Sequence, residues 1–165
     1  MTETGALPTP PPPPHGPAPF RPATPGRRSS MVLRHLASVV VALVLTPVGV
    51  LVFDHGAGSY RQVLARTFDN GEAAGELLQM FAGGLILLAV VACARVSGLG
   101  PLLAGVVWGL LPFLWYVADV RSFFEFARDL PSTYFWFSLP EYLFPLVAVM
   151  LLGAGLVGRW RGRPQ

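Results

Sequence analysis

Six polar side chains near the ends of apolar segments are the groups in this sequence that could do chemistry. They comprise five carboxylates and one imidazole: Asp54, His55, Glu72, Glu76, Asp119 and Glu141. Such groups bind divalent cations, and histidine is a common general base, so they would suit a metal or cationic-ligand site or a membrane-face hydrolase. No H-E-x-x-H, D-x-D or nucleophile-elbow motif organises them. We assign no catalytic residue and no cofactor, and we keep five of them as metal candidates: Asp54, His55, Glu72, Glu76 and Asp119.

Thiol chemistry is restricted by the cysteine content of the chain. Cys93 is the single cysteine, so no internal disulfide, C-x-x-C redox pair or cysteine metal cluster can form within one chain. We expect Cys93 to pack as a small apolar residue. All twelve basic residues are arginine, so the sequence has no glycine-rich phosphate loop with its lysine.

Four long apolar runs, with almost no charged residue in them, must position these groups. They cover residues 36–53, 77–94, 99–118 and 139–157, and each has 18 to 20 residues. A helix needs about 20 residues to cross a hydrocarbon core of about 30 Å, and backbone groups inside a bilayer must bond to each other. The sequence therefore predicts an all-α polytopic membrane protein. Its domain, residues 31–158, has four transmembrane helices at about 32–53, 77–95, 100–118 and 139–158.

Composition leaves little sequence for a soluble catalytic domain. The chain of 165 residues is 53% apolar and 13% charged, against about 25% charged in an average globular domain. Residues 1–30 hold ten of the seventeen prolines and few apolar side chains, so we predict a disordered, proline-rich cytoplasmic tail. This tail is a solvated tether, a docking peptide for a proline-binding partner, or a segment that precedes a translation start at Met31.

Arginine placement predicts the orientation in the membrane. Eight arginines and one acid flank the spans on the side that holds both termini, whereas the other two loops hold four arginines and eight acids. Because retained arginines mark the cytoplasmic side, we predict that both termini are cytoplasmic, including the basic tail 159–165. The net charge of +3 is then explained by topology, and we expect the basic residues to meet lipid rather than nucleic acid.

The two loops on the opposite side are predicted to contain short interfacial helices. Apolar side chains recur at helical spacing in loop 54–76, at Tyr60, Val63, Leu64 and Phe68, and at about 120–130, at Phe123, Phe126, Ala127 and Leu130. Gly56 and Gly58 are expected to stop the first span before the first of these helices. Aromatic rings gather at headgroup depth, and the candidates for such contacts are Phe123, Phe126, Tyr134 and Trp136.

Helix ends, small residues and prolines predict how the spans pack. Ser138 followed by Glu141 matches a capping box at the start of the last span. Small residues that let helices approach closely are Gly83, Gly84, Gly105, Gly109, Ala154 and Gly158, either for packing within the chain or for a dimer contact. Prolines lie inside three spans, at Pro47, Pro112 and Pro145, and kinks there predict a bundle splayed into a shallow vestibule on the non-cytoplasmic side.

These features favour a small integral membrane protein without enzymatic activity. Arginine as the only basic residue, with abundant Ala, Gly, Pro and Val, indicates a GC-rich bacterial genome and hence a bacterial inner membrane. We expect an accessory subunit that binds the bilayer and either another membrane protein or itself. The alternatives are a homo-oligomeric channel or small-solute transport component, and a membrane-face enzyme that uses the acidic rim.

Overall fold

The computed structural model describes residues 31–132 and 136–158, which are helical throughout apart from short turns. The helices are α1 (Met31–Thr67), α2 (Ala74–Ala92), α3 (Leu99–Gly105), α4 (Leu111–Ala118), α5 (Val120–Arg128) and α6 (Pro140–Val157). Within the described residues, four helical stretches are long and apolar enough to cross a membrane: Met31–Thr67, Ala74–Arg95, Leu99–Ala118 and Pro140–Val157. The predicted all-α class with four candidate spans is therefore confirmed. The two predicted tails, 1–30 and 159–165, lie outside the described residues.

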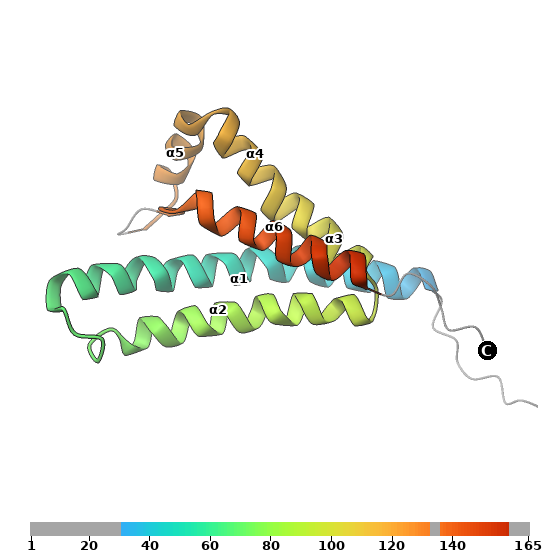
Figure 1. The fold of residues 1–165 in the computed structure, drawn as a ribbon, viewed down its shortest axis with the longest axis horizontal. Coiled ribbons are helices and arrows are strands. Elements are labelled where there is room, and N and C mark those ends of the chain that lie inside the picture. The colour runs from blue at the N-terminus through green and yellow to red at the C-terminus, as the bar shows by residue number, and fades with distance from the viewer. Residues whose placement is uncertain (1–30, 133–135, 159–165) are drawn as a thin grey trace, which may run out of the picture.

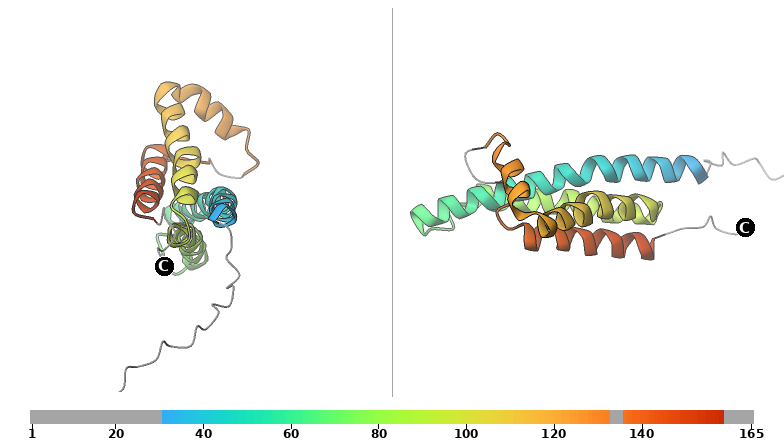
Figure 2. Two further views of the ribbon diagram at one scale, coloured as in Figure 1. Left: turned by 90° about the vertical axis from the view of Figure 1, so that its right-hand side faces the viewer. Right: turned by 90° about the horizontal axis from the view of Figure 1, so that it is seen from above.

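The helices run back and forth between two ends of the bundle (Figure 1). One end carries α5 and the α1–α2 turn, and we call it the α5 end. The other end carries the α2–α3 turn together with the start of α1 and the end of α6. Helix α1 packs against α2 and α3, and α6 packs against α3 and the segment that follows it. The views in Figure 2 show the same arrangement end-on and from above.

The first span is longer than the sequence predicted, because α1 continues without interruption for 37 residues to Thr67. The separate interfacial helix expected in loop 54–76 is therefore wrong: residues 54–67 are the last turns of α1. Gly56 and Gly58 do not stop the helix, since both are buried within it. A Cβ atom at Gly56 would lie 2.8 Å from the backbone nitrogen of Met80, so the close approach of α2 stabilises the helix at this position.

The third span contains a π-helical segment, Val106–Leu110, between α3 and α4. The N–H of Leu111 donates to the carbonyl of Val106, five residues earlier. Pro112 follows directly, and a proline ring clashes with the carbonyl four residues before it. The wider π turn makes room for the ring without breaking the span.

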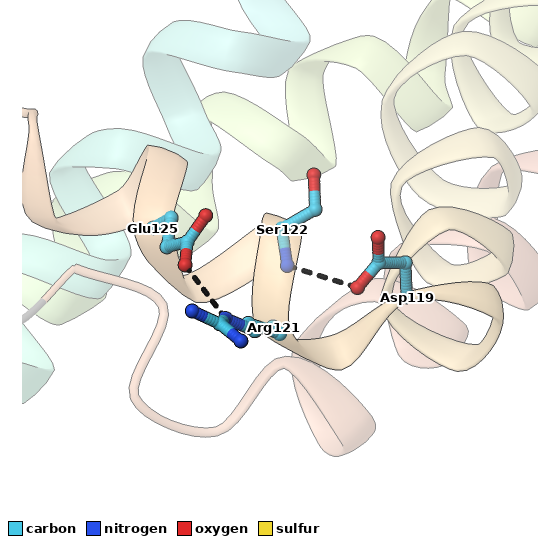
Figure 3. A network of polar contacts seen from close by, with 4 residues as sticks. All are labelled: Asp119, Arg121, Ser122 and Glu125. Carbon is cyan, nitrogen blue, oxygen red and sulfur yellow. Dashed lines mark hydrogen bonds and ion pairs between the residues drawn. The ribbon is translucent and has the colours of Figure 1, made fainter.

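Helix α5 confirms the predicted helix at about 120–130, ending at Arg128. Asp119 is its N-cap and accepts a hydrogen bond from the backbone N–H of Ser122 at 3.0 Å. Arg121 and Glu125 form an exposed ion pair at 2.9 Å, one turn apart (Figure 3). The position of α5 at a membrane interface stays a prediction.

The capping box predicted for Ser138 and Glu141 is wrong. Helix α6 has Leu139 as its N-cap residue and no side-chain cap. The hydroxyl of Ser138 instead accepts a hydrogen bond from the guanidinium of Arg61, on α1. Pro140 begins the helix, where a missing N–H costs nothing.

Small residues bring helix backbones into contact at several crossings. A Cβ added at Gly83 of α2 would lie 2.6 Å from the backbone nitrogen of Phe53. One added at Gly109 would lie 2.6 Å from the Cα of Ala148 on α6, and one at Gly158 would lie 2.6 Å from the Cα of Gly98. These contacts leave no space for a side chain, so the α1–α2 and α3–α6 pairs depend on glycine.

Gly83 and Gly84 form a matched pair that tests this packing. We expect Gly83→Ala to lower the free energy of unfolding by about 1–3 kcal/mol, because the new methyl group would overlap the backbone of α1. Gly84 has no atom within 4 Å of an added Cβ, so Gly84→Ala should leave stability unchanged or raise it by about 0.5–1 kcal/mol. Unfolding of both variants in detergent micelles measures the difference. Equal effects of the two substitutions would contradict backbone contact at Gly83.

Candidate functional site

The structure does not bring the predicted acidic rim together. Asp119 caps α5, and Glu72 is exposed in the turn after α1. Glu76 lies in the first turn of α2, and Glu141 in the first turn of α6. In residues 31–132 and 136–158, no three His, Cys, Asp or Glu side chains are grouped so that they could hold a metal ion.

Asp54 does not lie on an exposed acidic rim. It is on α1 and is buried against the segment before α6. Its Oδ2 accepts a hydrogen bond from the backbone N–H of Phe137 at 2.9 Å. Phe137 has a φ of 50°, which is unusual for a bulky residue and requires support from its surroundings. Together with the bond from Arg61 to Ser138, this contact fixes residues 137–138 onto α1.

His55 follows Asp54 on α1 and faces α2. Its Nδ1 lies 3.0 Å from Nε2 of Gln79, and its ring centroid lies 5.9 Å from that of Trp136. This histidine, hydrogen-bonded to an amide and tilted against an indole, links α1, α2 and the segment before α6. Its contacts with Gln79 and Trp136 are thus structural ones between neighbouring segments.

A second polar cluster, which the sequence did not predict, joins α1 to the α2–α3 turn. Nδ1 of His35 lies 2.5 Å from Oγ of Ser97, and the hydroxyl of Ser38 donates to the carbonyl of Ser97 at 3.1 Å. The guanidinium of Arg34 donates to the carbonyl of Val96 at 3.1 Å. A serine–histidine pair resembles a nucleophile and its base, but Ser97 is fully buried and no substrate can reach its oxygen. The cluster therefore acts as a clamp between helices.

The predicted small-residue positions divide into two groups. Gly83, Gly105, Gly109 and Gly158 meet other helices of the same chain, with Gly105 lying against Leu151 and Leu152 of α6. Gly84 faces open space, and Ala154 lines a shallow hollow with Arg95 and Val157. The ridge from Gly105 to Gly109 is thus covered by α6 within the protomer.

The predicted interfacial aromatic residues also differ in their burial. Phe123 is only 2% exposed and packs edge-on against Trp115, Tyr116 and Phe144, so its predicted place at the lipid interface is wrong. It is buried because α5 folds back over α4 and the start of α6. Phe126 is 48% exposed, and its place at the lipid interface stays a prediction. Trp136 is partly buried beside His55, and Tyr134 lies outside the described residues.

An apolar pocket of about 310 Å³ lies beneath α5, where the prolines predicted a vestibule. Its lining comes from α1, the third span, α5 and the residues up to the first turns of α6: Pro47, Val50, Leu51, Trp108, Pro112, Trp115, Phe123, Phe126, Leu130, Phe137 and Phe144. Pro145 is not among them. Helix α4 climbs away from α1 (Figure 1), and no Cα atom of α4 comes within 8 Å of one in α1. The pocket occupies the space that this divergence leaves.

Pro47 and Trp108 form one wall of the pocket through a backbone contact. A proline has no N–H, so Pro47 frees the carbonyl of Leu43 four residues before it. Nε1 of Trp108 donates to that carbonyl at 3.0 Å. The bond satisfies both groups and joins α1 to the π-helical segment at the pocket wall.

The sequence contains a partial signal for this wall. A proline inside a span identifies the free carbonyl by its spacing of four, and an indole N–H in a span requires an acceptor. These two facts identify the Leu43 carbonyl and the Trp108 N–H as groups that need a hydrogen-bond partner. They do not show that the two bond to each other, because the sequence contains several tryptophans. Leu130 was predicted only as part of the apolar repeat at about 120–130, and nothing in the sequence indicated Phe137.

Protein-family models, characterised proteins and solved structures provide no match to this chain.

The Trp108–Leu43 bond can be tested by a double-mutant cycle. We expect Trp108→Phe to lower the free energy of unfolding by about 1–3 kcal/mol, because the Leu43 carbonyl would lose its donor in an apolar setting. Pro47→Ala restores an N–H to that carbonyl, so Trp108→Phe should cost much less in the Pro47→Ala background. Unfolding of the four proteins in micelles gives the coupling. If the changes in unfolding free energy of the two substitutions simply add, Trp108 does not donate a hydrogen bond to the carbonyl that Pro47 leaves free.

Proposed function

We propose that this protein is a non-enzymatic accessory subunit of a bacterial inner membrane. In this proposal both termini are cytoplasmic, and the α5 end faces the outside. The protein binds another membrane protein through the exposed face of α5, which carries Arg121 and Glu125. The observation that carries the proposal is that the small-residue faces, the other candidate contact surfaces, are largely used inside the protomer.

The packing of α6 supports this choice of surface. Gly105 and Gly109 lie against Leu151 and Ala148, so a second helix could reach this ridge only by displacing α6. Gly83 is covered by α1 in the same way. A partner helix would therefore find few sites of close backbone approach left on the spans.

The position of α5 provides the second support. Among the helices, α5 has Cα atoms within 8 Å of α4 alone. Its inner face is held by the buried Phe123 and Ala127, while the Arg121 and Glu125 side chains are 89% and 59% exposed. A short helix on an aromatic base, with charged side chains outward, offers the polar kind of surface found at the rim of protein contacts.

The two alternatives have less support. A membrane-face enzyme would need the acidic rim to converge, and Asp54 and Asp119 serve structural hydrogen bonds instead. A homo-oligomeric channel would place its pore between protomers, and its test is part of the experiment below.

Charge reversal on α5 tests the proposed contact. We expect the wild-type protein, purified in nanodiscs from its native membrane, to carry a foreign membrane protein in fixed stoichiometry by mass photometry and mass spectrometry. Arg121→Glu should lower the bound fraction about tenfold or more, because it removes the ion pair and reverses the charge offered to the partner. Arg66→Glu, at another exposed arginine near the end of α1, is the control and should retain the partner.

Two results would contradict the accessory role. One is a partner that remains bound to Arg121→Glu, which would move the contact elsewhere. The other is a wild-type homo-oligomer without a foreign protein, which conducts solute in liposomes and would favour the channel.

The orientation is tested separately by cysteine labelling. In a Cys93→Ala background, Arg66→Cys and Asp129→Cys should react with a membrane-impermeant maleimide added to intact spheroplasts. Val96→Cys, in the α2–α3 turn, should react only after lysis, since retained arginines place that turn inside. The reverse pattern would invert the topology.

A further inference from the structure

The pocket beneath α5 has a lining that excludes water. All its side chains are proline, valine, leucine, tryptophan or phenylalanine. A buried water needs two to four polar partners, and the indole N–H of Trp108 is already bonded to the carbonyl of Leu43. A cavity with this lining stays dry and accepts apolar molecules.

The pocket lies at the depth of the hydrocarbon core. Its α1 residues, Pro47 to Leu51, belong to the apolar run that ends at Phe53. At a rise of 1.5 Å per residue, they lie about 5–10 Å below Asp54, the first charged residue of α1 beyond that run. What surrounds the pocket is therefore lipid chains rather than water.

The pocket has a closed floor and an open mouth. Phe123, Phe144 and Val50 at the floor are less than 5% exposed. Leu51, Trp108 and Trp115 at the mouth are 37–39% exposed, and Phe126 is 48% exposed. The mouth opens between α1 and α4, where the two helices have separated.

We propose that this pocket binds one acyl chain of a membrane phospholipid. A methylene group has about the volume of a water molecule, about 30 Å³, so a pocket of about 310 Å³ holds on the order of ten methylenes of one chain. The lining has no charged side chain, so it recognises the chain and not the headgroup. The α5 helix covers the bound chain, with Phe123 and Phe126 against it.

This site is independent of the contact proposed for α5. The chain enters below α5 from the bilayer, whereas the partner would bind the outward side at Arg121 and Glu125. Purified protein in plain vesicles therefore tests the lipid site alone, and Arg121→Glu should not alter it.

The test uses a photoreactive lipid in vesicles of phosphatidylcholine. A small fraction of the lipid carries a diazirine near the end of one acyl chain, and adducts are mapped by peptide mass spectrometry after irradiation. We expect adducts at Phe123 or Phe144, which bulk lipid cannot reach. Leu88, exposed on α2, reports labelling by bulk lipid, and Val90, fully buried outside the pocket, should stay unlabelled.

A variant at the mouth links the adducts to the pocket. Leu51→Trp adds bulk at a partly exposed position, and we expect it to reduce the adducts at Phe123 and Phe144 about tenfold or more by steric exclusion. Leu88→Trp, the same change on α2, should leave them at the wild-type level. If Leu51→Trp fails to fold, Phe126→Trp on the other side of the mouth replaces it.

Three outcomes would overturn the proposal. The first is labelling at Leu88 without labelling at Phe123 or Phe144. The second is an unchanged amount of adduct at Phe123 and Phe144 in a Leu51→Trp or Phe126→Trp variant that folds. The third is floor labelling in pure vesicles that is absent in native membranes containing the same photolipid, which would assign the pocket to a side chain of a partner.

Discussion

Contact between helix backbones at glycine is the constraint on which this structure depends. Lipid offers the helices as apolar an environment as they offer each other, so close packing and hydrogen bonds must hold them together. Gly83 brings α2 onto α1 at Phe53, Gly109 brings the third span onto α6 at Ala148, and Gly158 meets Gly98. The hydrogen bonds of His35 and Ser38 with Ser97 then hold α1 against the α2–α3 turn.

The α5 end is built on another principle, because α4 diverges from α1 there. Its helices are held by aromatic rings around Phe123 and by hydrogen bonds from side chains to the backbone. Asp54 fixes the strained Phe137, and Trp108 takes the carbonyl that Pro47 leaves free. Each of these polar groups makes a structural contact, and in the described residues no three His, Cys, Asp or Glu side chains are grouped so that they could hold a metal ion.

Hydrophobic length alone predicted the four spans, and periodicity predicted α5. The end of α1 could not be predicted, because whether Gly56 ends the helix depends on whether α2 packs on it. Phe123 and Phe126 share one helical repeat, and only the position of Phe137 and Phe144 decides which of them is buried. Prolines 47 and 112 predicted an opening, but its apolar lining follows from the return of α5 over it.

The unbroken α1 has a mechanical consequence. Its 37 residues measure about 55 Å, nearly twice the hydrocarbon thickness of about 30 Å, and they form one uninterrupted helix. A rod of this length converts angle into displacement: a change of about 10° in tilt moves one tip by about 10 Å relative to the other. Asp54 and Arg61 attach the segment before α6 to this helix. A change in bilayer thickness that tilts α1 would therefore also change the position of the α5 end.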